Sequence, residues 1–371
     1  MNKKSNKLIK IIITGGGTGG HITPLVAVVE ELKEHDCDIT FIGSGNDLEK
    51  RAAKNVGLEY KSILSGKFRR YLSWENFIDP FKVLIAIIQA KWILLFNRPD
   101  VIFSKGGYVG FPVVFAGWFL RIPIVIHESD VIMGMANRWS VRFAKKVCVG
   151  FPVDNYKDIS LDKVVYTGNP VRQQFNNLTP RANSGQANKQ SNNKSKLPII
   201  LITGGSQGSR FLNQTIAAML FDITQRYHVI HVAGKNDMEW LKKNSWPNYE
   251  LYEYTDKLPE FMKKADLIIS RSGANTTAEI SALSKPSILI PLPSGANDHQ
   301  TENAKIYERN NAAVVLSEQG LTADSLKDII DRLMEAKKML REIGENANKL
   351  SQPNSAQEIA KEILLFSKKE I

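Results

Sequence analysis

A short apolar run followed by a glycine-rich turn occurs twice in this chain. IKIIIT (9–14) leads into GGGTGG (15–20), and PIILIT (198–203) leads into GGSQGS (204–209). After the first turn, apolar residues recur at helical spacing, namely Leu25, Val28, Val29 and Leu32. The repetition predicts two similar domains, each opening with a strand, a tight turn and a helix.

The same strand-then-helix rhythm continues through both halves. Further short apolar runs lie at 38–43, 100–107, 122–129 and 146–151, and then at 228–234, 249–254, 266–273, 286–293 and 312–317. Strands that alternate with segments long enough for crossover helices are typical of α/β folds with parallel sheets. With 371 residues, the chain is long enough for two such domains. We therefore predict two doubly wound parallel sheets.

Composition suggests where the domains divide. Residues 181–196 lack apolar periodicity and are rich in Asn, Ser, Lys and Gln, which is typical of a flexible surface segment. We expect a first domain at 1–168, a hinge and polar insertion at 169–196, and a second domain at 197–352. An amphipathic helix at about 353–371 is expected to pack back on the first domain.

The charge indicates which binding partners to expect, and the cysteine content bears on disulfides and metal sites. Lysine and arginine number 49 against 38 acidic residues, and the net charge of +11 favours anionic partners such as phosphorylated substrates or acidic lipid. We find no zinc-finger spacing, RNP-type signature or long basic helix, so no nucleic-acid partner is expected. The two cysteines, Cys37 and Cys148, form no CxxC pair and predict neither a disulfide scaffold nor a metal site.

The glycine turns are candidate anion-binding sites. A turn that opens a helix offers unpaired backbone N–H groups and the positive end of the helix dipole. Gly15, Gly17 and Gly20 match the GxGxxG spacing of dinucleotide-binding domains, but the second strand ends Phe41-Ile42-Gly43-Ser44-Gly45 without the acid that would hold a ribose. A nicotinamide or flavin cofactor is therefore not expected.

Seven ordered motifs across nearly the whole chain carry a specific resemblance. They are GGGTGGHITP (15–24), FSKGGYVGFPV (103–113), IHESD (126–130), TGNPVR (167–172), GGSQGS (204–209), SRSGANTTAEI (270–280) and HQTENA (299–304). In this order they resemble the bacterial N-acetylglucosaminyltransferases that form lipid II. The resemblance implies a GT-B fold, with two Rossmann-like domains facing a cleft. It also implies transfer of GlcNAc from UDP-GlcNAc to the C4 hydroxyl of lipid I, with inversion and without a metal.

The resemblance places the donor UDP-GlcNAc mainly on the second domain. Ser206 and Gln207 are expected at the pyrophosphate, Arg172 adds positive charge as UDP departs, and Glu279 accepts the ribose hydroxyls. The backbone near Thr255 is expected at the uracil. Further contacts to the nucleotide or sugar are implied for Ala274, Asn275, Thr276, Thr277 and Gln300. Without the resemblance, Glu279 alone would be interpreted as part of a solvated helix face.

The acceptor and the catalytic base are assigned to the first domain. His21 directly follows the glycine turn and is the leading candidate base, although a histidine there could equally stabilise the turn. Glu128 is a second candidate base or an orienting partner for His21. Thr18, Gly19 and Gly20 are expected to bind the acceptor pyrophosphate. Asp130 is assigned to sugar recognition, although the commonest family form has Gln and Asn where this chain has Ser129 and Asp130.

An apolar segment suggests membrane contact. Residues 81–96, FKVLIAIIQAKWILLF, would form a helix of about 24 Å, which is too short to span a hydrocarbon core of about 30 Å. It could form a core helix or, with residues 118–121 and the basic Lys67, Arg69 and Arg70, part of a surface that meets anionic lipid. Both interpretations can hold if one face of the helix is core and the other faces lipid. We expect peripheral association with the cytoplasmic face of the membrane. Alternative functions are diacylglycerol glucosylation, UDP-GlcNAc epimerisation or noncatalytic UDP-sugar binding.

Overall fold

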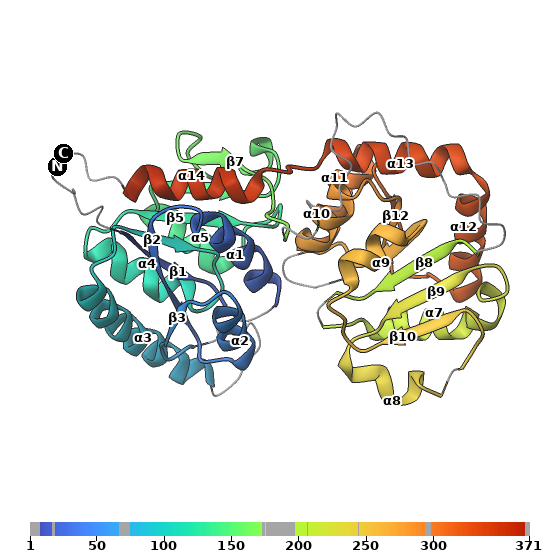
Figure 1. Ribbon diagram of the computed structural model, residues 1–371, viewed down its shortest axis with the longest axis horizontal. Coiled ribbons are helices and arrows are strands. Elements are labelled where there is room, and N and C mark those ends of the chain that lie inside the picture. Colours follow the sequence, from blue (N-terminus) through green and yellow to red (C-terminus); the bar gives the residue numbers. More distant parts are fainter. Residues whose placement is uncertain are drawn as a thin grey trace, which may run out of the picture. The chain divides into compact units, whose positions relative to one another are not determined.

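The computed structural model describes residues 8–16, 19–66, 75–172, 175, 197–205, 207–243, 245–293 and 298–367. The chain divides into two compact units, Met1–Arg172 with Asn354–Ile371, and Gln173–Pro353. Each unit is a parallel sheet with helices packed against it (Figure 1). Most of the expected hinge and insertion, 173–174 and 176–196, lies outside the described residues.

The first unit contains a seven-stranded sheet in the order β3-β2-β1-β4-β5-β6-β7. Its strands are β1 (Ile9–Thr14), β2 (Cys37–Gly43), β3 (Glu59–Ser62), β4 (Val101–Ser104), β5 (Ile124–Glu128), β6 (Lys146–Val149) and β7 (Val164–Tyr166). All their pairings are parallel. The central strands β4 and β5 are buried along their whole length, as their continuous apolar sequences require.

Helices cover both faces of this sheet. They are α1 (Gly19–Leu32), α2 (Asp47–Asn55), α3 (Glu75–Asn97), α4 (Gly110–Phe119), α5 (Met135–Ser140) and α14 (Ser355–Ser367), with short 3₁₀ turns η1 (Val141–Phe143) and η2 (Val153–Asn155). α1 contacts α2 and α14, while α4 contacts α3 and α5. The last helix of the chain thus completes the first unit, where Ile359 and Ile363 are fully buried in the core.

The second unit contains a six-stranded parallel sheet in the order β10-β9-β8-β11-β12-β13. Its strands are β8 (Ile199–Thr203), β9 (His228–Val232), β10 (Tyr249–Tyr252), β11 (Leu267–Ser270), β12 (Ser287–Leu289) and β13 (Val314–Val315). The helices are α7 (Arg210–Ile223), α8 (Met238–Leu241), α9 (Leu258–Lys264), α10 (Ala274–Ala282), α11 (His299–Arg309), α12 (Ala323–Glu335) and α13 (Lys337–Lys349), with η3 at Lys235–Asp237.

Side chains cap the N-termini of two helices in the second unit, α7 and α12. Ser209 precedes α7, and its hydroxyl accepts a hydrogen bond from the N–H of Leu212 at 3.3 Å. Thr322 precedes α12 in a capping box with Ser325. Such caps satisfy N–H groups that lack partners within the helix. α7, α12 and α13 then bury their apolar residues against one face of the sheet.

Both sheets reverse their strand order at the strand that leads into a glycine turn. In the first unit, β1 lies between β2 and β4, and in the second, β8 lies between β9 and β11. The register places Thr14 beside Ser104 and Thr203 beside Ser270. In open parallel sheets, ligands bind beyond the carboxyl ends of the strands at this kind of reversal. The segments after β1, β4, β8 and β11 are therefore the candidate ligand-binding segments.

Helix α3 is longer than the apolar run that predicts it and has two apolar faces. It contains 23 residues rather than the 16 from Phe81 to Phe96, so the expected length of about 24 Å is too short. Ala86, Ala90 and Leu94 are buried against the unit. On the opposite face, large apolar side chains are exposed, from 42% at Leu95 to 79% at Phe96. No helix in the described part of the chain is long and apolar enough to cross a membrane.

Candidate active site

The backbone of the first glycine turn packs directly against the backbone of the loop after β4. The N–H of Lys105 donates to the carbonyl of Thr14 at 2.8 Å. A Cβ at Gly15 would lie 2.9 Å from the Cβ of Lys105, and one at Gly107, whose φ is +79°, would lie 2.2 Å from the carbonyl oxygen of Gly16. Only glycine fits this approach. The two loops therefore form one surface at the reversal of the sheet.

His21 lies on the first turn of α1, beside this surface. Its side chain is half-buried. Desolvation and then the charge of Lys105 lower the pKa of His21 to about 4, although Asp130 and a hydrogen bond to the backbone of Lys105 act in the opposite direction. At neutral pH the imidazole is thus uncharged and able to accept a proton. Gly19 begins the helix and Gly20 is exposed, while Gly17 and Thr18 lie outside the described residues.

Glu128 ends β5 and organises the loop that follows it. Its carboxylate accepts three hydrogen bonds of 3.0 Å, from the N–H groups of Asp130 and Gly134 and from Nδ2 of Asn137. Burial, followed by the charge of Asp130, raises the pKa of Glu128, while Lys105 lowers it. Because both carboxylate oxygens are engaged, this geometry favours the orienting role for Glu128 over the role of base.

Lys105 and the segment after β5 bring further charge to the site. The Nζ of Lys105 donates to the hydroxyl of Ser129. The carbonyl of Ser129 accepts from Asn169 at 2.9 Å, and the carbonyl of Asp130 accepts from Tyr156 at 2.9 Å. The carboxyl group of Asp130 is half-buried and close enough to Lys105 to raise its pKa. His21, Lys105, Glu128 and Asp130 therefore share one site in the first unit.

The second glycine turn is also held by close backbone packing. A Cβ at Gly204 would lie 2.4 Å from the nitrogen of Ser209, and one at Gly208, whose φ is +72°, would lie 2.3 Å from the carbonyl oxygen of Ala233. The turn therefore leads directly into α7, as an anion-binding turn requires. Gln207 is exposed on it, and Ser206 lies outside the described residues.

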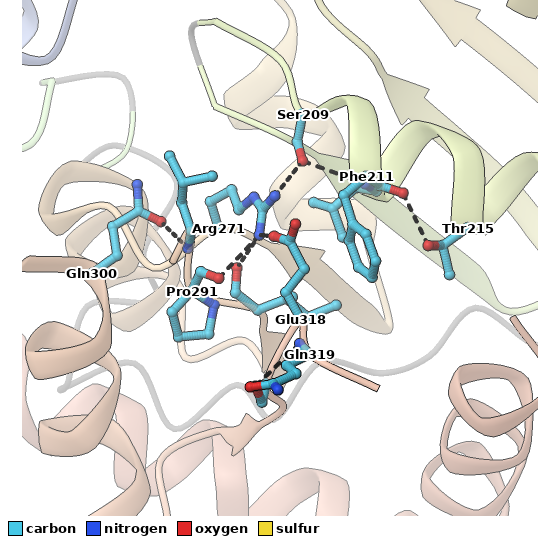
Figure 2. A network of polar contacts seen from close by, with 12 residues as sticks. Ser209, Phe211, Thr215, Arg271, Pro291, Gln300, Glu318 and Gln319 are labelled. Carbon is cyan, nitrogen blue, oxygen red and sulfur yellow. Dashed lines mark hydrogen bonds and ion pairs between the residues drawn. The ribbon is translucent and has the colours of Figure 1, made fainter. Parts of the chain in front are cut away.

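A buried arginine ties the second glycine turn to the neighbouring strand ends. Arg271 follows β11, and its guanidinium donates to the hydroxyl of Ser209 at 2.7 Å and to the carbonyls of Ile290 and Pro291 at 3.1 and 3.0 Å. Figure 2 shows Arg271 with Ser209 and Pro291 around it. The guanidinium also forms an ion pair of 2.6 Å with Glu318. Since these contacts use most of its donors, Arg271 has a structural role: it holds the start of α7 against the segments after β12 and β13.

Helix α10 carries most of the residues expected to bind the donor. Glu279 is only 6% exposed, so it does not belong to a solvated helix face. Thr277 is buried, and its hydroxyl donates to the carbonyl of Ala274 at 3.1 Å within the helix. Ala274 is also buried, while Asn275 and Thr276 are half-buried. The N-terminus of α10 follows β11 and lies at the reversal of the sheet.

Gln300 is linked to the same region. Its carbonyl accepts from the hydroxyl of Ser272 at 2.8 Å, and its side-chain oxygen accepts from the N–H of Leu292 at 3.0 Å. The structure thus places Gln300 beside the loop that precedes α10. Thr255 lies apart, after β10, in a turn where its hydroxyl accepts from the N–H of Lys257 at 3.0 Å. Arg172 is half-buried at the end of the first unit. Burial and then the charge of Glu31 raise the pKa of Glu30, and the nearby charge of Arg172 opposes that rise.

Comparison with known proteins identifies the family. The glycosyltransferase family 28 N-terminal domain matches residues 11–149, and the C-terminal domain of that family matches residues 199–363. A UDP-N-acetylglucosamine–N-acetylmuramyl-(pentapeptide) pyrophosphoryl-undecaprenol N-acetylglucosamine transferase from Clostridium tetani is 40% identical over 88% of this chain and 90% of its own length. The transferase of the same name from Clostridium botulinum (strain Langeland) is 41% identical over 88% and 91%. The chain belongs to this transferase family.

Solved structures agree with the family assignment. MurG of Acinetobacter baumannii superposes with a TM-score of 0.74 at 26% identity, covering 96% of this chain and 99% of that one. A UDP-N-acetylglucosamine 2-epimerase superposes with a TM-score of 0.68 over 97% and 96% of the two chains, but at 12% identity it shows the fold alone. The predicted GT-B fold is confirmed.

Two charged residues of the site, Lys105 and Arg271, are missing from the predicted set. Both directly follow a buried strand, VIFS and LIIS respectively, and both lie within motifs of the MurG family. Both residues could have been predicted from their position, because each is a charged residue at the carboxyl end of a central strand. In the part of the chain that the structure describes, no group of three or more His, Cys, Asp and Glu could hold a metal ion.

Proposed function

We propose that the protein transfers GlcNAc from UDP-GlcNAc to the C4 hydroxyl of lipid I, forming lipid II. The observation that carries the proposal is the 40–41% identity, over about nine-tenths of each chain, to transferases whose names state this donor and acceptor. The site in the first unit supports it, because a neutral histidine lies beside a glycine turn that opens a helix.

The proposed reaction is a single displacement. The acceptor C4 oxygen forms a bond to C1 of GlcNAc as the bond between C1 and the β-phosphate oxygen breaks, and the configuration at C1 inverts. The hydroxyl proton passes to His21, while Glu128 holds the loop after β5 in place. The leaving UDP carries the negative charge, which Arg172 and the N–H groups beside Ser206 and Gln207 stabilise.

The binding roles divide between the units. Thr18, Gly19 and Gly20 bind the acceptor pyrophosphate, and Asp130 binds the acceptor sugar. For the donor, Glu279 accepts the ribose hydroxyls, Gln300 and residues 274–277 surround the nucleotide, and the backbone at Thr255 meets uracil. The position of Glu279 supports its role, since it lies on α10, which follows a central strand at the reversal of the second sheet. We propose that no metal ion takes part.

We further propose that the protein works at the cytoplasmic face of the cell membrane as a peripheral protein. Lipid I has a polyprenyl tail that stays in the bilayer, so the enzyme must meet its acceptor there. The exposed face of α3 supports this, and we call it the α3 surface: Phe81, Leu84, Ile85, Ile88, Trp92, Leu95 and Phe96. Soluble proteins rarely expose such a stripe without a binding partner.

The neighbouring helix extends the α3 surface. Trp118 and Phe119 on α4 are exposed, and the Nζ of Lys91 lies 4.5 Å from the ring centroid of Phe119. Arg121 is exposed next to them. Aromatic and cationic side chains together suit the interface of an anionic bilayer. The basic residues Lys67, Arg69 and Arg70 of the expected patch lie outside the described residues.

The function is tested by mixing the purified protein with labelled UDP-GlcNAc, a short-chain lipid I analogue and EDTA. The proposal predicts a labelled disaccharide-lipid. If UDP-GlcNAc binds but no product forms, the acceptor assignment is wrong, and transfer to diacylglycerol or epimerisation of the free donor would then be measured. Product that requires added Mg²⁺ would contradict metal independence while leaving the transfer assignment intact.

A further inference from the structure

Lys105 is a buried lysine at the reversal of the first sheet. Its side chain is 1% exposed, and its backbone is tied to the end of β1 through Thr14. A buried ammonium group is costly unless opposite charges and hydrogen bonds compensate it. Here the compensation comes from the hydroxyl of Ser129 and from the charges of Glu128 and Asp130.

Several charged or titratable groups of the first unit surround Lys105. His21 faces it from α1, and His127, Glu128 and Asp130 face it from β5 and the loop after β5. Its positive charge lowers the pKa values of His21, His127 and Glu128. Desolvation in turn lowers the pKa of Lys105 itself to about 8. One side chain is therefore coupled to the candidate base and to both neighbouring carboxylates.

We propose that Lys105 is a positioning residue of the first-unit site: its buried ammonium group holds Ser129, balances Glu128 and Asp130, and sets the electrostatic potential at His21. The inference rests on the proposed function, in which His21 accepts the proton of the acceptor hydroxyl. Lys105 touches neither substrate in this account. It acts through the imidazole, whose pKa is lowered first by burial and further by the charge of Lys105, and through the loop that carries Asp130.

Replacing Lys105 with methionine keeps the length of the side chain and removes its charge. We expect Lys105→Met to lower kcat at pH 7 at least tenfold, because the loop that carries Ser129 and Asp130 loses its contact with the ammonium group. The variant should also raise the acidic pKa of the kcat/KM profile by about one unit, because a nearby positive charge no longer opposes protonation of His21. Lys105→Arg keeps the charge and should keep the acidic limb where it is in the wild type. A purely structural role would lower Tm in both variants and leave the acidic limb unmoved.

Lys285→Met is the matched control. Lys285 is another partly buried lysine, and its Nζ donates to the carbonyl of Ala265 in the second unit at 2.8 Å. This variant should lose some stability and keep the wild-type pH profile. If Lys105→Met and Lys285→Met have the same profile as the wild type, the inference is wrong.

NMR separates failure of the inference from failure of the proposed function. In the full-length wild-type protein with ¹³C-labelled lysine, the Lys105 signal should titrate near pH 8. With ¹³C-labelled histidine, the His21 signal of Lys105→Met should titrate about one unit higher than that of the wild type. These results do not require turnover. A Lys105 signal that titrates below pH 7 would overturn the inference even if Lys105→Met does not fold, because the side chain would then carry no charge at neutral pH. Wild-type protein that shows the expected titrations but makes no lipid product would overturn only the function.

Discussion

Glu279 illustrates how one buried side chain connects the fold to donor binding. It lies on α10, directly beyond the strand-order reversal of the second sheet, and is nearly inaccessible. A hydrogen bond to a charged group contributes about 1.5 to 3 kcal/mol, against about 0.5 to 1.5 kcal/mol for one between neutral groups, so a carboxylate is a stronger acceptor than an amide. Glu279 should therefore contribute to the affinity for UDP-GlcNAc rather than to the chemical step.

We predict that Glu279→Gln raises the KM for UDP-GlcNAc about 10- to 100-fold and changes kcat much less. Initial-rate kinetics with varied donor, together with calorimetric titration of UDP-GlcNAc, would measure both effects. Glu335→Gln is the control, because Glu335 is exposed on α12 and pairs with Arg226, away from the strand-order reversal. A normal donor KM in Glu279→Gln would remove Glu279 from the donor site.

His231 makes the second unit sensitive to acid. It is fully buried on β9, where its ring nitrogens bond to Tyr249 and Asn213 at 3.0 Å. Desolvation lowers the pKa of His231 from 6.5 to about 4. Between these values the unfolded chain binds a proton that the folded unit does not, so stability falls as pH falls.

We predict that this histidine alone removes up to about 3 kcal/mol of stability between pH 7 and pH 4. Denaturant unfolding of the second unit across that range, followed by hydrogen exchange of β8 and β9 amides, would measure the loss. In His231→Gln the same curve should be flatter, because glutamine does not titrate. Parallel curves for the two proteins would show that acid sensitivity arises elsewhere.

The hydrogen-bond partners of the buried charged residues were the part of the site that the sequence could not predict. Lys105 and Ser129 are 24 residues apart and Arg271 and Ser209 are 62 apart, so only the folded chain shows that each pair bonds. In a sequence, an isolated lysine or arginine has the appearance of a solvated residue. His21, Glu128 and Glu279 could be named because they lie in family motifs at strand ends and helix starts.

Elements were more predictable than side-chain contacts. The buried strands are rich in β-branched residues, and the two glycine turns mark where helices begin. The edge strand β3 was not predicted, because its sequence EYKS contains polar residues and its side chains are exposed or half-buried. α3 was predicted too short, since its first turns, Glu75 to Pro80, lack the apolar run that follows.

α14 offers a test at the level of one element. Ile363 is fully buried among residues of α1 and the first sheet, although it lies far away in sequence. We predict that Ile363→Ala destabilises the first unit by about 2 to 5 kcal/mol, through lost burial and the cavity left behind. Hydrogen exchange of β1 and β8 amides should show faster opening in the first unit and no change in the second.

The control for this variant lies on the same helix. Leu365 is 55% exposed, and Leu365→Ala should change stability by no more than about 0.5 kcal/mol. If Ile363→Ala affected the second unit as much as the first, the assignment of α14 to the first unit would be contradicted.

At the scale of the whole molecule, the α3 surface should determine membrane affinity. We predict that Ile88→Ser weakens binding to vesicles containing phosphatidylglycerol about tenfold, because one large apolar side chain no longer leaves water on docking. Leu365→Ser is the control, since Leu365 is similarly exposed on α14. Vesicle co-sedimentation of both variants and the wild type would measure the difference, and equal affinities would argue against docking through α3.

The central claim is that this chain joins GlcNAc to the muramyl sugar of lipid I with inversion. The most direct measurement is the linkage in the product, obtained by NMR of the disaccharide released from a lipid I analogue after reaction with UDP-GlcNAc. The account predicts a β-linkage from C1 of GlcNAc to O4 of the muramyl sugar. An α-linkage, or GlcNAc attached at another position or acceptor, would contradict it.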